Sequence, residues 1–452
     1  MSPLGSPRPT SFRNRATAAQ RRDLPDRTGP TRVAYSSSKT SGGLQRRLAH
    51  AVGAMSGASV LGAAIAFLST PLLVHWFPPA QFGEVAYALA AASILSSLVS
   101  LRLELVIYKV PAADRRETAW LATLVTIAIA TLLLVAALPF ASLLGGAAHS
   151  GTSNLLVIYA MLVSICIANI GVAFLTAEGR YVAAGIPKVI SPLVLLAAAA
   201  VIHLAPDTGG LQLVIANVLG LIAAAGLYLG CFAGRFDAVA LRGARALVRR
   251  NKRYIMFAAP QNSVAIAGFL NLGMIIIGTC YGKHAAGEVF MAFRLVGFPS
   301  TVLGVAASNF IAAESGGRAI EKLSSYALAM AGAGVAIYLP LLLAGLALPA
   351  EWLPTEWRGA VDMLPPMTLL CFAHFVIGSF GQILLVRDRA GQMLAWDSAR
   401  LLVTCSLVLA CWLLGGGYIL AMWLFVCAQL PLYLVLALLV RRAAAAPSAM
   451  AG

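Results

Sequence analysis

Residues 121–138 of this 452-residue chain read LATLVTIAIATLLLVAAL, a run without a single charged side chain. An α-helix rises about 1.5 Å per residue, so about 20 such residues cross the roughly 30 Å hydrocarbon core of a bilayer. The apolar segment extends over residues 117–144, and Arg115 and Arg116 directly precede it. We therefore expect this stretch to be a transmembrane helix with basic residues at its first end.

Eleven more segments have the same character, which predicts an all-α polytopic membrane protein. The chain is 60% apolar and 11% charged, unlike the composition of a soluble domain. We expect twelve transmembrane helices at about residues 52–76, 82–108, 117–144, 153–177, 181–205, 211–233, 254–280, 287–313, 323–349, 361–386, 392–414 and 416–440. The connections between these spans are short.

Lys and Arg residues are unevenly distributed around the spans. Of the 33 in the chain, 27 lie before the first span, after an even-numbered span, or after the last one. The opposite connections contain only Lys283 and Arg358. Because basic loops stay in the cytoplasm, we expect both termini to be cytoplasmic and the number of spans to be even.

The net charge of +16 is interpreted in the same way. In a soluble protein it would suggest a nucleic-acid partner. Here it lines one face of the membrane, where anionic lipid headgroups attract it. We therefore expect membrane lipids, and no nucleic acid, as partners of these basic residues.

The longest interior connection, residues 234–253, divides the spans into six and six. The predicted organisation is a disordered basic cytoplasmic tail (1–47), an N-terminal six-helix bundle (48–233), a basic cytoplasmic linker (234–253), a C-terminal six-helix bundle (254–440) and a cytoplasmic tail (441–452). The two predicted bundles are expected to enclose a central cavity.

A short repeat relates the two halves. Gly83-Glu84-Val85, near the start of the second span, recurs 204 residues later as Gly287-Glu288-Val289, near the start of the eighth. Since each half has an even number of spans, both enter the membrane from the same side. Their pseudo-two-fold axis is then expected along the membrane normal, with a cleft between the halves.

Four basic residues lie inside the predicted spans: Arg102, Lys188, Arg294 and Arg400. Charged groups are costly in hydrocarbon and mark functional sites by default. The alternative is that long side chains near span ends extend their charge to the headgroups. Arg294 is the least suited to do so, because it lies about two turns inside its span with only Glu288 nearby. Its planar guanidinium can donate two parallel hydrogen bonds to a phosphate.

Two of these cations have a carboxylate close in sequence. Asp397 precedes Arg400 by three positions, which permits a neutralising pair on a helix. Glu104 follows Arg102 by two positions, and we expect no ion pair there because that spacing puts the side chains on different faces of a helix. The candidate substrate-binding residues are Arg294, Arg102, Glu104, Lys188, Arg400 and the intramembrane amide Asn271.

Patterns for catalysis and metal binding are missing from the sequence. It contains no GxxxxGK[ST] phosphate loop. Its seven cysteines form no CxxC pair and have no histidine cluster beside them. The expected outer connections are too short for a catalytic domain. We therefore expect neither an enzyme, nor a cofactor, nor a metal.

Three stretches of the chain share a family likeness. Pro78-Pro79 and Phe82-Gly83, with residues 102–107 (RLELVI), are similar to a family segment that ends in an Arg-Tyr-Glu-x-Ala-Ile signature, although Leu103 replaces its aromatic residue. Residues 254–260 together with 286–299 match the pattern with which the second half of the proteins in that family begins. Residues 356–360 (EWRGA) with 387–400 resemble the segments around spans 10 and 11. These stretches resemble the Wzx-like polysaccharide transporters, lipid-linked oligosaccharide flippases of the MATE/MOP superfamily.

This resemblance implies a function and a set of partners. The expected function is translocation of an undecaprenyl-pyrophosphate-linked oligosaccharide to the periplasmic leaflet of the inner membrane, by alternating access. The glycan would serve exopolysaccharide, capsule or O-antigen synthesis. Arg102, Glu104 and Arg294 are the residues that match the family pattern. The implied partners are the lipid-linked oligosaccharide, a polysaccharide polymerase and export proteins.

Two other functions are considered as alternatives to the flippase. A MATE-type cation-coupled efflux transporter of small molecules would be expected to have acidic cavity groups, whereas the unassigned intramembrane residues here are mostly basic. A glycan polymerase or ligase would need a sizeable outer domain, and the sequence offers no segment for one.

Overall fold

The computed structural model describes residues 41–108, 110–140, 148–204, 211–232, 252–304, 307, 323–347, 354–387 and 389–445. Residues 234–251 of the predicted basic linker and most of both predicted tails lie outside these residues. Residues 48–452 form one compact unit, separate from residues 1–47. Everything that follows concerns the described part of the larger unit, whose regular elements are all helices.

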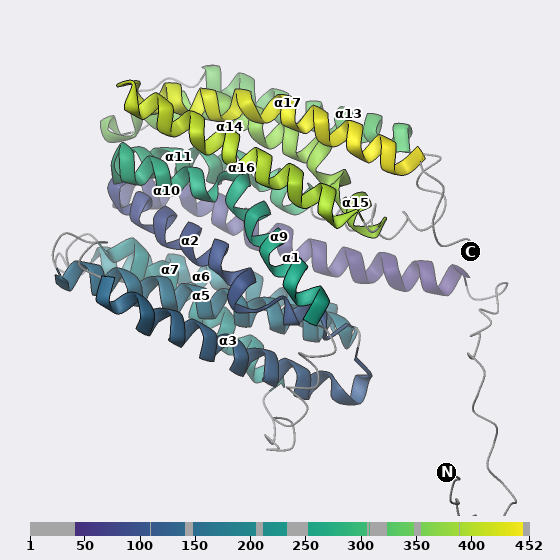
Figure 1. Cartoon of the computed structure of the whole chain (residues 1–452). Coiled ribbons are helices and arrows are strands. Elements are labelled where there is room, and N and C mark those ends of the chain that lie inside the picture. The colour runs from purple at the N-terminus through teal and green to yellow at the C-terminus, as the bar shows by residue number, and fades with distance from the viewer. Residues whose placement is uncertain are drawn as a thin grey trace, which may run out of the picture. The chain divides into compact units, whose positions relative to one another are not determined.

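The helices of the first half follow the predicted spans. They are α1 (Ser41–Trp76), α2 (Pro79–Val99), α3 (Arg115–Ala137), α5 (Ala148–Ala177), α6 (Tyr181–His203) and α7 (Gln212–Phe232), as Figure 1 shows. Short 3-10 helices at Leu103–Leu105, Ala112–Asp114 and Leu138–Phe140 flank α3. Pro79 is the first residue of α2, a position where the missing N–H would have no partner in the helix.

The second half contains more interruptions. Its helices are α9 (Lys252–Ile266), a π-helix (Ala267–Asn271), α10 (Leu272–Cys280), α11 (Lys283–Val296), a second π-helix (Ser300–Gly304), α13 (Leu323–Ala347), a 3-10 helix (Thr355–Trp357), α14 (Arg358–Ile377), a 3-10 helix (Gly378–Gly381), α15 (Gln382–Val386), α16 (Ala390–Leu413) and α17 (Tyr418–Ala445). In Figure 1, α9 is steeply inclined to its neighbours before the chain straightens into α10. The π-helix between them supplies the bend.

Eleven helices in the described part of the chain are long and apolar enough to cross a membrane. The predicted span at residues 287–313 is not among them: α11 ends at Val296, a π-helix covers Ser300–Gly304, and residues 305, 306 and 308–313 lie outside the described part of the chain.

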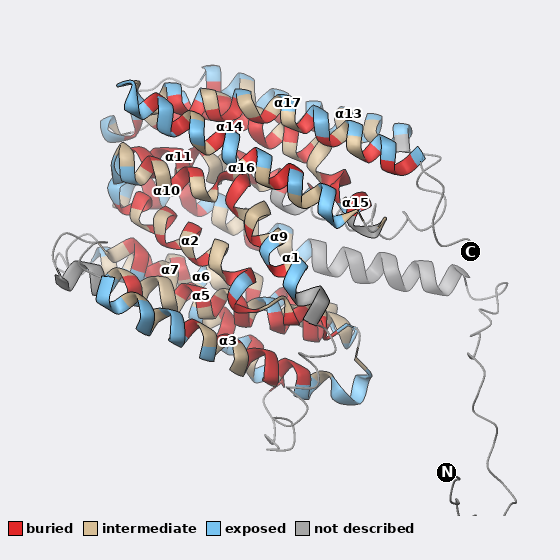
Figure 2. Cartoon of the chain, in the orientation of Figure 1, coloured by how far each residue is buried: buried red, intermediate tan, exposed pale blue. Residues whose placement is uncertain are grey.

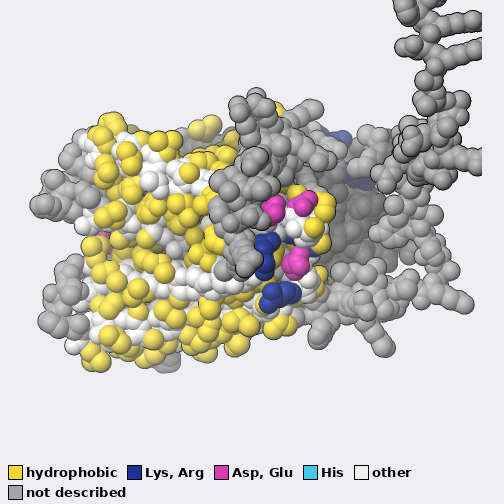
Figure 3. Space-filling model, turned by 90° about the horizontal axis from the view of Figure 1, so that it is seen from below, with side chains coloured by type: hydrophobic (Ala, Val, Ile, Leu, Met, Phe, Trp, Pro, Cys, Tyr) yellow, Lys and Arg dark blue, Asp and Glu magenta, His cyan; other side chains and the backbone are white. Residues whose placement is uncertain are grey.

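Large apolar side chains cover much of the described surface. Leu132, Leu328 and Leu414 are 68%, 76% and 87% exposed, and exposed residues line the outward faces of the helices in Figure 2. On the face drawn in Figure 3, hydrophobic side chains dominate, while Lys, Arg, Asp and Glu gather toward one end. This distribution suits a protein surrounded by lipid.

Helices α2 and α11 cross at the two glycines of the sequence repeat. A Cβ atom on Gly83 would lie 1.8 Å from the Lys283 carbonyl oxygen, and one on Gly287 would lie 1.8 Å from the Pro79 carbonyl oxygen. Lys283 and Pro79 each lie four positions before one of these glycines. The contact is therefore reciprocal, like one across a two-fold axis, and only glycine fits at either position.

Candidate functional site

Arg294 lies on α11, and its guanidinium reaches α1. Its Nη2 donates to the Ala66 carbonyl oxygen at 3.2 Å and to the Ser69 hydroxyl at 3.4 Å. Both partners are neutral, and no carboxylate in the described residues forms an ion pair with it. The half-buried guanidinium therefore retains an uncompensated charge. Its further N–H groups suit an anionic acceptor such as phosphate.

Lys188 contacts the same helix from α6. Its Nζ donates to the Ser59 hydroxyl at 3.1 Å. Nearby, a Cβ atom on Gly62 would lie 2.3 Å from the Lys188 carbonyl oxygen, so the backbones of α1 and α6 touch there. Within the described part of the chain, Lys188 also lacks a carboxylate partner.

The residues of α1 that meet these two cations share one face of the helix. Ser59, Gly62, Ala66 and Ser69 are separated by three or four positions and form what we call the α1 polar stripe. The contact points of Lys188 and Arg294 are two helical turns apart, about 10 Å along the axis. Two of the six candidate residues are thus brought to one helix face.

The prediction that Arg102 and Glu104 do not pair is wrong. Arg102 Nη1 and Glu104 Oε1 lie 3.3 Å apart. The prediction assumed a continuous helix, but α2 ends at Val99, and the backbone then reverses. Leu101 and Arg102 have φ angles of 51° and 54°, in the left-handed region that residues other than glycine seldom adopt. The reversal brings the two side chains together.

Burial holds this turn in place. Leu103, Val106 and Ile107 are each at most 1% exposed and pack into a local apolar core. Residues in unfavourable backbone regions cost about 1–3 kcal/mol each, so they persist only where the surroundings enforce them. The Arg102 charge is partly cancelled by Glu104, which distinguishes it from the Arg294 charge.

Arg400 is 3% exposed and belongs to a buried hydrogen-bonded network, in which its Nε is the one guanidinium nitrogen without a partner in the described residues. Its Nη2 donates to Asp397 Oδ1 at 3.0 Å and to the Ala265 carbonyl oxygen at 2.9 Å, and its Nη1 donates to the Tyr433 hydroxyl at 3.3 Å. Gln261 donates to the second Asp397 oxygen at 3.1 Å. The predicted pair of Asp397 and Arg400 is confirmed, and its charges cancel within the network.

The network lines a cavity of about 290 Å³ between α14, α16 and α17. The Trp396 ring lies 4.6 Å from Arg400 Cζ, a favourable cation–π geometry. His374 Nδ1 lies 3.0 Å from the Tyr433 hydroxyl. Sequence reasoning missed His374 and Tyr433, for which the only signal is a polar group in an otherwise apolar span.

Asn271 is engaged within its own segment. Its Nδ2 donates to the Ile266 carbonyl oxygen at 2.9 Å, and Gln429 of α17 donates to the Phe269 carbonyl oxygen at 3.1 Å. Together with the bond from Arg400 to Ala265, side chains satisfy three carbonyls around the π-helix. A π turn departs from α-helical pairing, so these contacts stabilise the bend between α9 and α10.

Comparison with known proteins places this geometry in a known fold. No family model and no curated protein matches the chain. Among solved structures, the MATE multidrug transporter DinF-BH, solved as a ligand complex, superposes with a TM-score of 0.64 at 13% identity, over 90% of this chain and 97% of that one. The chain has a MATE-like fold.

Two further structures share the MATE-like fold. An outward-facing multidrug resistance MATE family transporter of the MOP superfamily has a TM-score of 0.58 at 14% identity, over 87% of this chain and 95% of that one. A MOP superfamily transporter from Pyrococcus furiosus has a TM-score of 0.57 at 16% identity, over 90% and 99%. With eleven membrane-capable helices in its described part, the chain is a multi-pass membrane protein with this fold.

Within this MATE-like fold the candidate residues fall into two groups. Lys188 and Arg294 face the α1 polar stripe without a carboxylate partner in the described residues. Arg102 and Arg400 each bind a carboxylate. The described residues contain no group of three or more His, Cys, Asp or Glu side chains that could hold a metal ion.

Proposed function

We propose that the protein is a flippase that moves an undecaprenyl-pyrophosphate-linked oligosaccharide from the cytoplasmic to the periplasmic leaflet of the inner membrane. The glycan would serve exopolysaccharide, capsule or O-antigen synthesis, and its translocation would occur by alternating access. The MATE-like transporter fold supports transport in general. The distribution of unpaired charge is what favours an anionic lipid as the substrate.

The observation that carries the proposal is the pair of unneutralised cations facing α1. Arg294 and Lys188 contact only neutral groups in the described residues, at the Ala66 carbonyl oxygen and at the hydroxyls of Ser69 and Ser59. An unpaired charge in a low-dielectric region is costly. A substrate that brings its own negative charge offsets that cost during transport.

The charged and polar groups of the proposed substrate are themselves costly to transfer into the membrane. A pyrophosphate and a hydroxyl-rich glycan lose their hydration in hydrocarbon, which opposes unaided crossing. In the proposed mechanism, Lys188 and Arg294 replace part of that hydration at two levels along α1. Arg294 binds phosphate through paired N–H groups, whereas Lys188 acts as a point charge.

A MATE-type cation-coupled efflux transporter would be expected to have free acidic groups in its cavity. Glu104 and Asp397 bind arginines, and Glu84 binds Lys283. Glu288 has no Lys or Arg partner in the described residues: it accepts a 2.5 Å hydrogen bond from the Tyr418 hydroxyl, and its Oε1 lies 3.6 Å from His284 Nε2. Three of these four carboxylates are thus paired with a basic side chain, which supports the flippase over the efflux transporter.

The likeness to multidrug transporters keeps cation efflux as the second candidate. One structure of the same fold is described as having a binding pocket of reverse polarity that suggests a different function. For the present chain, we take this as support for the idea that the fold can serve substrates of opposite charge.

Reconstitution into proteoliposomes separates the two functions. One set of vesicles contains a fluorescently labelled polyprenyl-pyrophosphate oligosaccharide, and a matched set is loaded with a fluorescent organic cation. The flippase predicts that the labelled glycan becomes accessible to an external glycosidase faster than in protein-free vesicles, with no protein-dependent cation flux. Cation flux without glycan exposure would support efflux and refute the proposal.

A further inference from the structure

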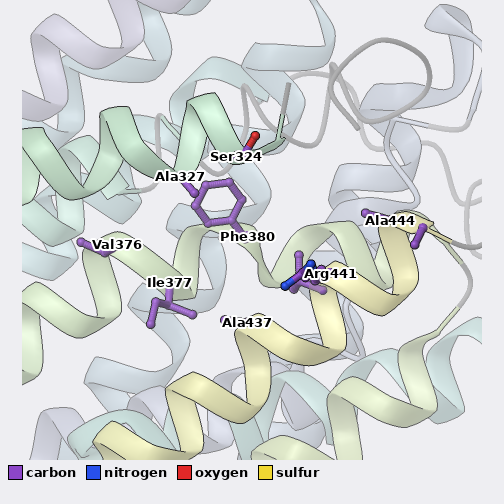
Figure 4. Close-up of a pocket in the computed structure, with 10 residues that line it drawn as sticks. Ser324, Ala327, Val376, Ile377, Phe380, Ala437, Arg441 and Ala444 are labelled. Atoms are coloured by element: carbon purple, nitrogen blue, oxygen red, sulfur yellow. The ribbon is translucent and has the colours of Figure 1, made fainter. Parts of the chain in front are cut away.

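A second cavity, of about 530 Å³, lies in the second half between α13, the end of α14 and α17 (Figure 4). Its size is within the range of about 300–1,000 Å³ that is usual for small-molecule sites. Its lining is apolar apart from one serine and one arginine. The lining residues are Ser324, Ala327, Val376, Ile377, Phe380, Ala437, Val440, Arg441, Ala444 and Ala445. We call this cavity the α13–α17 pocket.

The sequence explains why space remains between these helices. On α17, Ala437, Val440 and Ala444 recur at helical spacing and present small side chains along one face. On the opposite wall, Ala327 of α13 is equally small. Helix α14 ends at Ile377 and continues as a 3-10 helix, and Val376, Ile377 and Phe380 of this segment form the third wall. The pocket is open to the surface, so a molecule from outside the protein can enter it.

The pocket has a closed floor and an open rim. Phe380, Val440 and Ala444 are buried, whereas Ser324 and Arg441 are exposed. In Figure 4 the Phe380 ring and the Arg441 side chain both lie beside the space between α13 and α17. An apolar floor with a cation at the rim matches a molecule that has a hydrocarbon chain and an anionic head.

The charge at the rim is available to such a head. Among the described residues, Arg441 has no ion pair with a carboxylate, and none of those that line the pocket is acidic. It lies in the last two turns of α17, at the end of the span where the charge distribution places the cytoplasmic leaflet. Anionic lipids of that leaflet attract basic residues near the membrane surface.

The pocket also faces the bilayer. In the most apolar stretch of the span Ser324–Ala347, which includes most of α13, 11% of the residues are buried. The corresponding share is 61% in the span Thr355–Leu384, which includes α14. The α13 side of the pocket is thus next to lipid. None of the lining residues comes from α1, α6 or α11, which hold the proposed substrate contacts. This separation favours a resident membrane lipid over the transported one.

From these observations we propose that the α13–α17 pocket binds one acyl chain of an anionic phospholipid, with the lipid phosphate on Arg441. The occupied pocket would support the wall that it shares with the Arg400 cavity. Val376, Ile377 and Phe380 line the lipid side of that wall, while His374 and Ser379 line the other side. Bound lipid would thereby stabilise the interrupted end of α14.

Native mass spectrometry of the full-length protein in detergent tests the site. The protein is equilibrated with equal amounts of phosphatidylglycerol and phosphatidylcholine of identical acyl chains. We expect one phosphatidylglycerol to be retained in preference to phosphatidylcholine. Arg441→Gln should weaken that retention by roughly fivefold, the effect of about one basic charge near anionic headgroups. The matched control is Arg442→Gln, which removes the adjacent exposed cation that does not line the pocket.

Two filling variants test the acyl-chain contact. Ala437→Phe and Ala327→Leu place larger side chains into the pocket from opposite walls, so the conclusion does not depend on either variant alone. Each should abolish lipid retention while the protein remains monodisperse. Soluble glycerol phosphate, which has the head without the chain, should not compete.

Several results would overturn the proposal. Equal losses in Arg441→Gln and Arg442→Gln would indicate general surface electrostatics. Unchanged retention in both filling variants would place the lipid elsewhere. Displacement of phosphatidylglycerol by a polyprenyl phosphate at equal concentration would assign the pocket to the transported lipid instead.

Discussion

Arg294 and Arg400 are both arginines within apolar segments of the second half, but their surroundings differ. Arg400 is almost fully buried, and its charge is cancelled by Asp397 at 3.0 Å. Arg294 is half-buried and donates only to the Ala66 carbonyl oxygen and the Ser69 hydroxyl. The chemistry of their partners therefore separates the two arginines.

This contrast gives a criterion for intramembrane cations. An arginine whose charge is neutralised and whose donors are used within the protein stabilises helix packing. One that keeps a free charge beside neutral groups is held ready for an anion. By this criterion Lys188 belongs with Arg294, while Arg102, paired with Glu104, is closer to Arg400.

The largest expected effect is on stability, in the Arg400 network. Arg400→Met leaves the Asp397 carboxylate buried without its counter-charge, which costs about 3–5 kcal/mol. We expect a marked fall in melting temperature in detergent, measured by tryptophan fluorescence. Transport per folded molecule should change little.

The double variant Arg400→Met/Asp397→Leu is the matched control for this prediction. It removes both charges together, and most of the lost stability should return, because replacing a buried ion pair by apolar residues is often neutral. If Arg400→Met lost transport while its stability stayed unchanged, Arg400 would belong to the substrate site. The contrast between Arg294 and Arg400 would then be wrong.

A smaller effect, on transport, is expected at Lys188. Lys188→Ala should reduce the rate of glycan exposure in proteoliposomes about tenfold or more, since a hydrogen bond to a charged group contributes about 1.5–3 kcal/mol. Lys188→Arg should retain most of the rate, because a charge remains at the same level of α1. If Lys188→Ala transported the glycan at the wild-type rate, Lys188 would not bind the substrate, and Arg294 alone would remain as its proposed cationic contact.

The smallest effect is expected at Ser69, which orients Arg294. Ser69→Ala removes one neutral acceptor, worth about 0.5–1.5 kcal/mol, and should lower the transport rate a few-fold. Thr70→Val is the control, since the Thr70 hydroxyl also donates to the Ala66 carbonyl oxygen but does not contact Arg294. Equal effects in both variants would point to helix α1 itself rather than to Arg294.

Sequence alone predicted most of the fold because apolar length is a direct signature of membrane crossing. It predicted the helix of residues 121–138 and the i, i+3 pair of Asp397 and Arg400. The sequence predicted too long a helix for the second span, which was expected to end at residue 108, whereas α2 ends at Val99. Neither a glycine nor a proline marks the left-handed backbone at Leu101 and Arg102. The wrong prediction for Arg102 and Glu104 follows from that error.

The surroundings of the candidate cations could not be predicted in the same way. Arg294 is 228 residues from Ala66, and Lys188 is 129 residues from Ser59. Such contacts depend on which helices pack together, and no local pattern in the sequence specifies that. The reciprocal crossing at Gly83 and Gly287 was signalled by the repeat, but the contact between the two copies emerged only from the structure.

The central claim is that the free charge of Arg294 binds the phosphates of the transported lipid. The most direct measurement is the rate of exposure of a labelled polyprenyl-pyrophosphate oligosaccharide in proteoliposomes containing wild-type, Arg294→Ala or Arg294→Lys protein at matched folded amounts. We predict a loss of about 100-fold for Arg294→Ala and partial retention for Arg294→Lys, which keeps the charge but loses the paired N–H groups. A wild-type rate in correctly folded Arg294→Ala protein would contradict the account.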